Sequence, residues 1–196
     1  MSELPVLDDA RSLLGRALVG HGVTVLITEV EAYAGPLDPA SHAYTRTPRS
    51  DIMYGPPWRL YVYRSYGLHH CANVVTSPEG EASAVLVRAG RVVEGLDLAR
   101  ERRGPKVADV GLARGPGNLA EALGITLEDK GTDLLDPEPV HLGERVEEPA
   151  RVMAGPRVGV SKAADAPWRF WVDGDPTVSV YRRSPRAPRA SSVSPS

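Results

Sequence analysis

Residues Val23–Tyr33 read VTVLITEVEAY, a run in which β-branched side chains dominate. Such side chains favour extended backbone. Successive side chains of a strand point to opposite faces, so Glu29, Glu31 and Tyr33 share one face. We therefore predict a strand here that presents two carboxylates and a phenol on one side.

Further strands are expected on the C-terminal side of this segment. The patterns at residues 59–65, 69–76 and 82–89 each predict a strand, and the turn at 77–81 carries Pro and Gly. The loop before these strands, residues 35–51, is rich in Pro, Ser and Thr and is longer than a simple connection between elements usually is. Hairpin spacing of this kind favours a largely antiparallel sheet.

Helices are predicted on both sides of these strands. Asp8 or Asp9 is suited to cap a helix that runs to about Leu18. Residues 92–103 predict a second helix, and residues 116–124 a third that ends at a glycine. Two short strands are expected at 157–160 and 168–172. The fold class is thus α+β: one domain over residues 1–183, with a curved, largely antiparallel sheet and surrounding helices. The Pro-, Ser- and Arg-rich tail, residues 184–196, is expected to be disordered.

Composition limits the possible classes of protein. The 196 residues, 42% hydrophobic, suit one domain with a full core. The sequence contains no apolar run of about 18 residues, so no membrane span is predicted. Residues 1–9 are acidic and do not resemble a secretory signal. One cysteine, Cys71, excludes an internal disulfide framework and a cysteine-based zinc cluster. We expect a soluble, reduced, cytoplasmic protein without a metal or other cofactor.

Charge is unevenly distributed along the chain although the net charge is only −2. Residues 41–118 hold 11 basic and 7 acidic side chains, whereas residues 119–148 hold 2 basic and 9 acidic ones. Four more basic residues lie within 182–189. A basic middle and tail are able to face phosphates. A chance mixture on a solvated surface is the alternative.

Polar side chains interrupt the apolar strands at positions that share faces. Burying such groups costs free energy unless they are paired. One alternative is that Glu31 and Arg88 form only a structural ion pair. A convergence of carboxylate, aromatic, amide and guanidinium groups on one sheet face instead indicates a site. The expected groupings are Tyr61 with Tyr63, then His69 with Cys71 and Asn73, and finally Arg88 with Leu86 and Ala84.

Six segments resemble the 3-methyladenine (alkyladenine, or N-methylpurine) DNA glycosylase family. The resemblance runs in order from about residue 8 to residue 181. It implies a sheet architecture like that of the C-terminal domain of methionyl-tRNA formyltransferases. The segments are EVEAYAGPLDPASH (29–42), LYVYRSYGLHHCANVVT (60–76), AVLVRA (84–89), RGPGNLAEALGI (114–125), RVGVSKA (157–163) and PWRFWVDGDPTVS (167–179).

The resemblance implies a role for each matching residue. Glu31 is the catalytic carboxylate that deprotonates a water for attack on the sugar C1′. Tyr33 stacks on a flipped base, while His42 and Tyr63 cover its other side. Tyr66 is a wedge in the duplex. Asn73 is a pocket amide at the purine 2-position, and Arg88 orients the water and the sugar phosphate.

DNA-backbone contacts are implied less directly. Arg46 and Thr47 align loosely with DNA-contacting residues of the family, because the segment at 42–48 is short. Trp58 and Arg59 lie where bacterial relatives tend to have smaller residues, and Asn118 replaces a common phosphate-binding lysine. These departures concern affinity for the backbone and leave the chemistry unchanged.

The implied activity is monofunctional excision of alkylated or deaminated purines from double-stranded DNA by a monomer at the bacterial nucleoid. Extruding a base costs a few kcal/mol, which stacking on aromatic side chains offsets. The bond to the base breaks through an oxocarbenium-like state that a carboxylate stabilises. Strand cleavage needs an amine; Lys106, Lys130 and Lys162 are expected to lie outside the site, so the product is an intact abasic site.

Alternative functions remain open from the residues alone. The chain could be a non-catalytic nucleic-acid-binding module of the same fold, although such a module has no use for Glu31. It could instead hydrolyse free nucleosides, for which the wedge Tyr66 has no purpose. Glu29 and Glu31 could be the paired carboxylates of a sugar hydrolase, but Glu29 is expected to support the site. Cys71 is expected to be a small buried hydrophobe.

Overall fold

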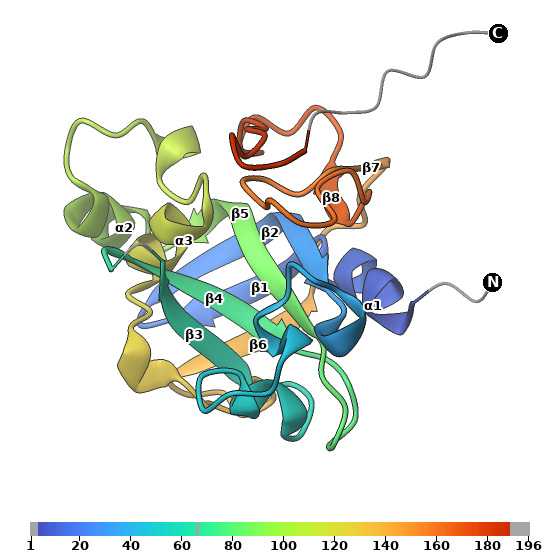
Figure 1. Ribbon diagram of the computed structural model, residues 1–196. Helices are drawn as coiled ribbons and strands as arrows, with labels where there is room; N and C mark the ends of the chain where they lie inside the picture. The colour runs from blue at the N-terminus through green and yellow to red at the C-terminus, as the bar shows by residue number, and fades with distance from the viewer. Residues whose placement is uncertain (1–3, 66, 189–196) are drawn as a thin grey trace, which may run out of the picture.

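The computed structural model of the protein describes residues 4–65 and 67–188. Within these ranges eight strands form one sheet, in which all pairs are antiparallel. Figure 1 shows that this sheet is curved, as predicted. The strands are β1 (Arg16–Gly20), β2 (Val23–Tyr33), β3 (Leu60–Ser65), β4 (His69–Val75), β5 (Ala84–Glu94), β6 (Val140–Arg145), β7 (Val152–Gly155) and β8 (Arg169–Val172).

Strand β2 lies at the centre of the sheet. The main order is β3-β4-β5-β2-β1-β6, so β5 runs along one edge of β2. The other edge is shared: β1 pairs with the first part of β2, and β8 pairs with Glu29, Val30 and Glu31. The two carboxylates therefore lie on a strand that is hydrogen-bonded on both sides.

In the described part of the chain three α-helices pack on the sheet: α1 (Pro5–Leu13), α2 (Leu96–Arg103) and α3 (Pro116–Leu123). Helix α1 contacts β2, and α3 contacts β4 and β5. Their buried leucines, such as Leu13 and Leu119, join one large apolar cluster with the strands. One face of the sheet is thus the main core, and the other is left for polar groups.

Alternation along the strands separates these two faces. Val62, Val74, Val85 and Val87 enter the main core. Their strand neighbours Tyr63, Asn73, Leu86 and Arg88 face the opposite side, as the sequence predicted.

In β2 the alternation changes phase at Glu29. The register with β5 shifts on both sides of this residue. As a result, the main core takes Val23, Val25 and Ile27 from the first part of β2 but Val30 and Ala32 from the second. The shift turns Glu29 and Glu31 away from the apolar cluster.

The first helix is shorter than predicted, because α1 ends at Leu13. Gly15 follows with φ +77°, and a Cβ there would lie 1.9 Å from the carbonyl oxygen of Glu147. The chain then forms β1 and turns at His21 and Gly22, which both have positive φ. This two-residue turn is typical of a β-hairpin. The prediction of helix to about residue 18 was therefore wrong.

Other boundaries also differ. Strand β5 continues to Glu94, so α2 begins at Leu96 rather than at residue 92. Residues 157–160 are irregular instead of extended, and Gly159 has φ +72°. Strands β6 and β7 were not predicted. No helix in the described ranges is long and apolar enough to cross a membrane.

Candidate active site

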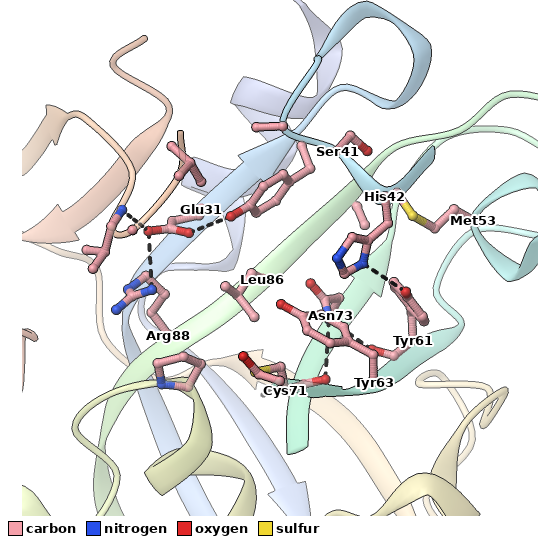
Figure 2. Close-up of a pocket in the computed structure, with 18 of the residues that line it drawn as sticks. Glu31, Ser41, His42, Met53, Tyr61, Tyr63, Cys71, Asn73, Leu86 and Arg88 are labelled. Atoms are coloured by element: carbon pink, nitrogen blue, oxygen red, sulfur yellow. Dashed lines mark hydrogen bonds and ion pairs between the residues drawn. The ribbon is translucent and has the colours of Figure 1, made fainter. Parts of the chain in front are cut away.

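A pocket of about 640 Å³ lies on the polar face of the sheet. Side chains from β2, β3, β4 and β5 line it, together with the loop that contains η2 (His42–Tyr44) and the segment at 158–162. Figure 2 shows Glu31 and Arg88 on one side of the pocket and His42, Tyr61 and Tyr63 on the other, with Leu86 and Asn73 between them. The volume is within the usual range for a small-molecule site.

The Glu31 carboxylate is fully buried and is held by two hydrogen bonds and one ion pair. The backbone N–H of Val158 donates to Oε1 at 2.7 Å, and Nη1 of Arg88 lies 3.3 Å from the same oxygen. The hydroxyl of Tyr33 donates to Oε2 at 2.8 Å. A carboxylate has about four acceptor sites, so this arrangement fixes the group and leaves it able to accept from one more molecule.

Arg88 connects Glu31 to Glu29. Its Nε donates to Glu29 Oε1 at 3.1 Å, while Nη2 donates to the hydroxyl of Ser179 at 3.2 Å. Burial alone would lower the pKa of Arg88, but the charges of Glu31 and Glu29 outweigh it and the pKa is raised. The guanidinium is therefore charged and fixed in direction.

Glu29 is saturated and does not line the pocket. It accepts hydrogen bonds from Arg169 Nη1 at 2.9 Å and from the backbone N–H of Ser179 at 2.7 Å, in addition to Arg88. The hydroxyl of Ser179 adds a further bond at 3.0 Å. Only Glu31 of the two carboxylates faces the pocket, so the geometry does not favour a carboxylate pair that acts on a sugar.

A buried ion pair packs against the ring of Tyr33. Arg157 Nη2 donates to Asp38 Oδ1 at 2.9 Å, and both side chains are fully inaccessible to solvent. The Arg157 guanidinium carbon lies 4.6 Å from the centre of the Tyr33 ring. Burial raises the pKa of Tyr33, and the charge of Glu31 adds to this, so the phenol stays protonated and donates to Glu31. Neither Asp38 nor Arg157 was singled out from the sequence.

His42, Tyr61 and Tyr63 form the aromatic wall. The rings of His42 and Tyr63 pack edge to face with centres 4.6 Å apart, and His42 Nδ1 lies 3.0 Å from the Tyr61 hydroxyl. The guanidinium carbon of Arg49 lies 5.0 Å from the centre of the Tyr63 ring. Which of His42 Nδ1 and the Tyr61 hydroxyl is the donor depends on the imidazole tautomer.

His42 is expected to be neutral at physiological pH. Partial burial lowers its pKa from 6.5 to about 4, and the charge of Arg49 acts in the same direction. Because the folded-state pKa is depressed, His42 contributes full stability above about pH 6.5. That contribution is lost as the pH falls toward 4. An NMR titration of the imidazole should show a midpoint near 4 in the folded protein and near 6.5 in urea; a folded midpoint at or above about 6 would contradict the assignment.

Asn73 presents its oxygen to the pocket. Its amide nitrogen donates to the backbone carbonyls of Tyr61 at 3.0 Å and Cys71 at 3.3 Å, which uses both protons. The oxygen would accept a hydrogen bond from a purine amino group.

The residues expected at the DNA backbone are not brought to the pocket. Arg46 pairs with Asp51 at 2.7 Å, and Arg59 with Asp133 at 3.1 Å. The Thr47 hydroxyl bonds with Ser50, and Asn118 donates to the Arg114 carbonyl at 2.7 Å. The basic residues Arg49, Arg64 and Lys162 line the pocket instead. Tyr66, the expected wedge, lies outside the described residues.

Two further expectations concern reactive groups. The lysines were expected to lie outside the site, which is wrong for Lys162 because it lines the pocket. Cys71 is buried, as expected, and burial raises the pKa of its thiol. In the described part of the chain no three His, Cys, Asp or Glu side chains are grouped to hold a metal ion.

Comparison with known proteins shows that this chain belongs to the methylpurine-DNA glycosylase family, whose model matches residues 1–176. It is therefore a DNA glycosylase, and DNA is its substrate.

Bacterial relatives resemble it over almost their whole length. Proteins named "Putative 3-methyladenine DNA glycosylase" are 54% identical in Mycolicibacterium paratuberculosis and in Mycobacterium tuberculosis strain H37Rv, and 55% identical in Nocardia farcinica. The matches cover 93%, 91% and 94% of this chain and 91% of each relative.

Proposed function

We propose that this chain is a monofunctional base-excision enzyme that flips alkylated or deaminated purines out of duplex DNA. A water activated by Glu31 then hydrolyses the N-glycosidic bond and leaves an abasic site. The observation that supports this most directly is the position of the buried Glu31 carboxylate. It is held by two hydrogen bonds and one ion pair, across the pocket from an aromatic wall.

Glu31 has the surroundings that a general base requires. Val158, Tyr33 and Arg88 fix its direction, so it is preorganised before substrate binds. Its negative charge also favours the positive charge that develops on the sugar as the bond to the base breaks. A module that only binds DNA would gain nothing from a carboxylate beside a phosphodiester.

The aromatic groups have the surroundings that base binding requires. Tyr33 on one side, and His42 with Tyr63 on the other, offer faces and edges to a purine. Arg64 and Lys162 are exposed at the pocket, where phosphates of a bound strand are accessible to them. All of these groups come from one chain, so we propose that the enzyme acts as a monomer, on chromosomal DNA in the bacterial cytoplasm.

Base release without strand cleavage is the expected result on duplexes that each carry one lesion. Hypoxanthine, ethenoadenine and 7-methylguanine are suitable lesions. Breaks should appear only after alkali, because a nick by the enzyme needs a Schiff base between an amine and the sugar. Gel analysis with and without alkali measures this directly.

Lys162 calls for a specific control, since it is the lysine at the pocket. Lys162→Ala should give the same alkali-dependent products as the unaltered chain. Borohydride trapping of a protein–DNA adduct that Lys162→Ala abolishes would contradict a monofunctional enzyme. Failure to release any lesion would contradict the proposed function as a whole.

A further inference from the structure

The hydroxyl of Ser179 lies between the guanidinium of Arg88 and the carboxylate of Glu29. Its Oγ donates to Glu29 Oε1 at 3.0 Å and accepts from Arg88 Nη2 at 3.2 Å. A hydroxyl carries one proton to donate and lone pairs to accept, so it satisfies both neighbours at once. Ser179 does not line the pocket. Any effect of this hydroxyl on chemistry in the pocket therefore passes through the groups that it holds.

Arg88 is held along one edge of its guanidinium. Nε donates to Glu29 Oε1 at 3.1 Å, and Nη2 donates to Ser179. The third nitrogen, Nη1, lies 3.3 Å from Glu31 Oε1, on the side of Arg88 that faces Glu31 in Figure 2. Because the guanidinium is planar and rigid, fixing Nε and Nη2 also fixes the direction of Nη1. Ser179 and Glu29 thus determine how Arg88 meets Glu31.

Ser179 is itself firmly attached to the sheet. Its backbone N–H donates to Glu29 Oε2 at 2.7 Å. Two positions earlier, the hydroxyl of Thr177 bonds with that of Thr28 on β2 at 2.8 Å, and both of these side chains are buried. The segment that carries Ser179 is therefore fastened to the same strand that carries Glu29 and Glu31. A residue that positions a catalytic group needs such a rigid support.

Loss of the Ser179 hydroxyl would remove one of the two hydrogen bonds along this edge of Arg88. Hydrogen bonds that involve a charged group are among the stronger ones in proteins. Arg88 would then be attached to Glu29 by Nε alone, so its guanidinium could pivot about that bond. Such a pivot moves Nη1 relative to Glu31, and small misplacements of reacting groups slow a reaction strongly.

We propose that Ser179 is a positioning residue that aligns Arg88 with Glu31 for hydrolysis of the N-glycosidic bond. This inference rests on the proposed function and adds to it a residue outside the pocket. It predicts that loss of the hydroxyl slows base release while binding of DNA is unchanged.

The first test measures single-turnover release from a duplex with hypoxanthine or 7-methylguanine, whichever the unaltered chain releases faster. Ser179→Ala should lower this rate by about tenfold or more. Affinity for a duplex with an abasic-site analogue should stay within about twofold. Ser179→Thr keeps the hydroxyl and should restore most of the rate.

Thr177→Val is the matched control, because it removes a buried hydroxyl from the same segment. That hydroxyl bonds to Thr28 and Asp175 and not to Arg88. Thr177→Val should therefore lower the free energy of unfolding but leave the rate of the folded protein unchanged. If Thr177→Val slows base release as much as Ser179→Ala does, the segment only supports the fold and the inference is wrong.

A double-mutant cycle tests whether Ser179 acts through Arg88. Arg88→Gln removes the group that Ser179 aligns, so adding Ser179→Ala to it should lower the rate no further. A double variant about tenfold slower than Arg88→Gln alone would show that Ser179 acts elsewhere. In that case, or if Ser179→Ala keeps the full rate, the inference fails although the chain remains a glycosylase. If the unaltered chain releases no base, the proposed function fails and the inference with it.

A second readout does not depend on activity. The two protons on a guanidinium nitrogen give separate NMR signals only while rotation of that nitrogen is hindered. Arg88 Nη2 should give two signals in the free protein, and Ser179→Ala should merge them, whereas Ser179→Thr and Thr177→Val should not. Two unchanged signals in Ser179→Ala would mean that the hydroxyl does not hold the guanidinium, and would overturn the inference.

Discussion

Replacing Glu31 with glutamine is expected to lower the single-turnover rate of base release by about a thousandfold or more. Glutamine keeps the shape of the side chain. Its oxygen can still accept from Val158 and Arg88, and its amide can donate to the Tyr33 hydroxyl, which is also an acceptor. The change removes the basic group and its charge, but Arg88 keeps its ion pair with Glu29. Affinity for DNA that contains an abasic-site analogue should therefore stay within about twofold.

Glu29→Gln is the matched control, because the same change is made two residues away on the same strand. Glu29 accepts from Arg88, Arg169 and Ser179, so its loss leaves buried cations under-neutralised and should lower the free energy of unfolding. Glu31→Gln should instead be folded, DNA-binding and inactive. A Glu31→Gln rate above a few per cent of the unaltered rate would remove Glu31 as the base.

Sequence patterns predicted elements such as β2 and α3, whose bounds depend on residues that are neighbours in the sequence. The bounds of β2 follow from its β-branched run, and α3 ends at Leu123, where the left-handed Gly124 caps it. The first helix was extended too far because Leu13, Leu14, Ala17 and Leu18 have helical spacing. The hairpin turn at His21 and Gly22 was the signal that could have corrected it.

The candidate site was likewise predictable only where it depends on local sequence patterns. Strand alternation grouped polar residues within each strand, and the structure brings Glu31, Tyr63, Asn73 and Arg88 into one pocket. Alternation carries no information about partners far away in sequence. Val158 reaches Glu31 across 127 positions, and Arg157 reaches Asp38 across 119. Arg49 was missed because it lies in a loop without regular periodicity.

Asp38→Asn is expected to lower the free energy of unfolding by about 3–5 kcal/mol, because it leaves the Arg157 charge buried without a partner. Both side chains are fully inaccessible, and Asp38 also accepts from the Ala40 N–H at 3.0 Å. Urea unfolding should show a lower midpoint with an unchanged slope. Asp51→Asn is the matched control: its pair with Arg46 is 61% and 59% exposed, so the loss should stay below about 1 kcal/mol.

Stability alone does not show whether this pair also positions the site. Replacing both partners, as Asp38→Leu with Arg157→Met, should restore much of the stability, since apolar groups of similar size can substitute for a buried ion pair. The double variant still lacks the guanidinium that packs on Tyr33 and donates to the Ala32 carbonyl at 2.9 Å. If its base-release rate recovers with its stability, the pair only holds the fold. We expect a stable enzyme that remains slow, because Tyr33 and the Val158 N–H fix Glu31, and Arg157 adjoins both.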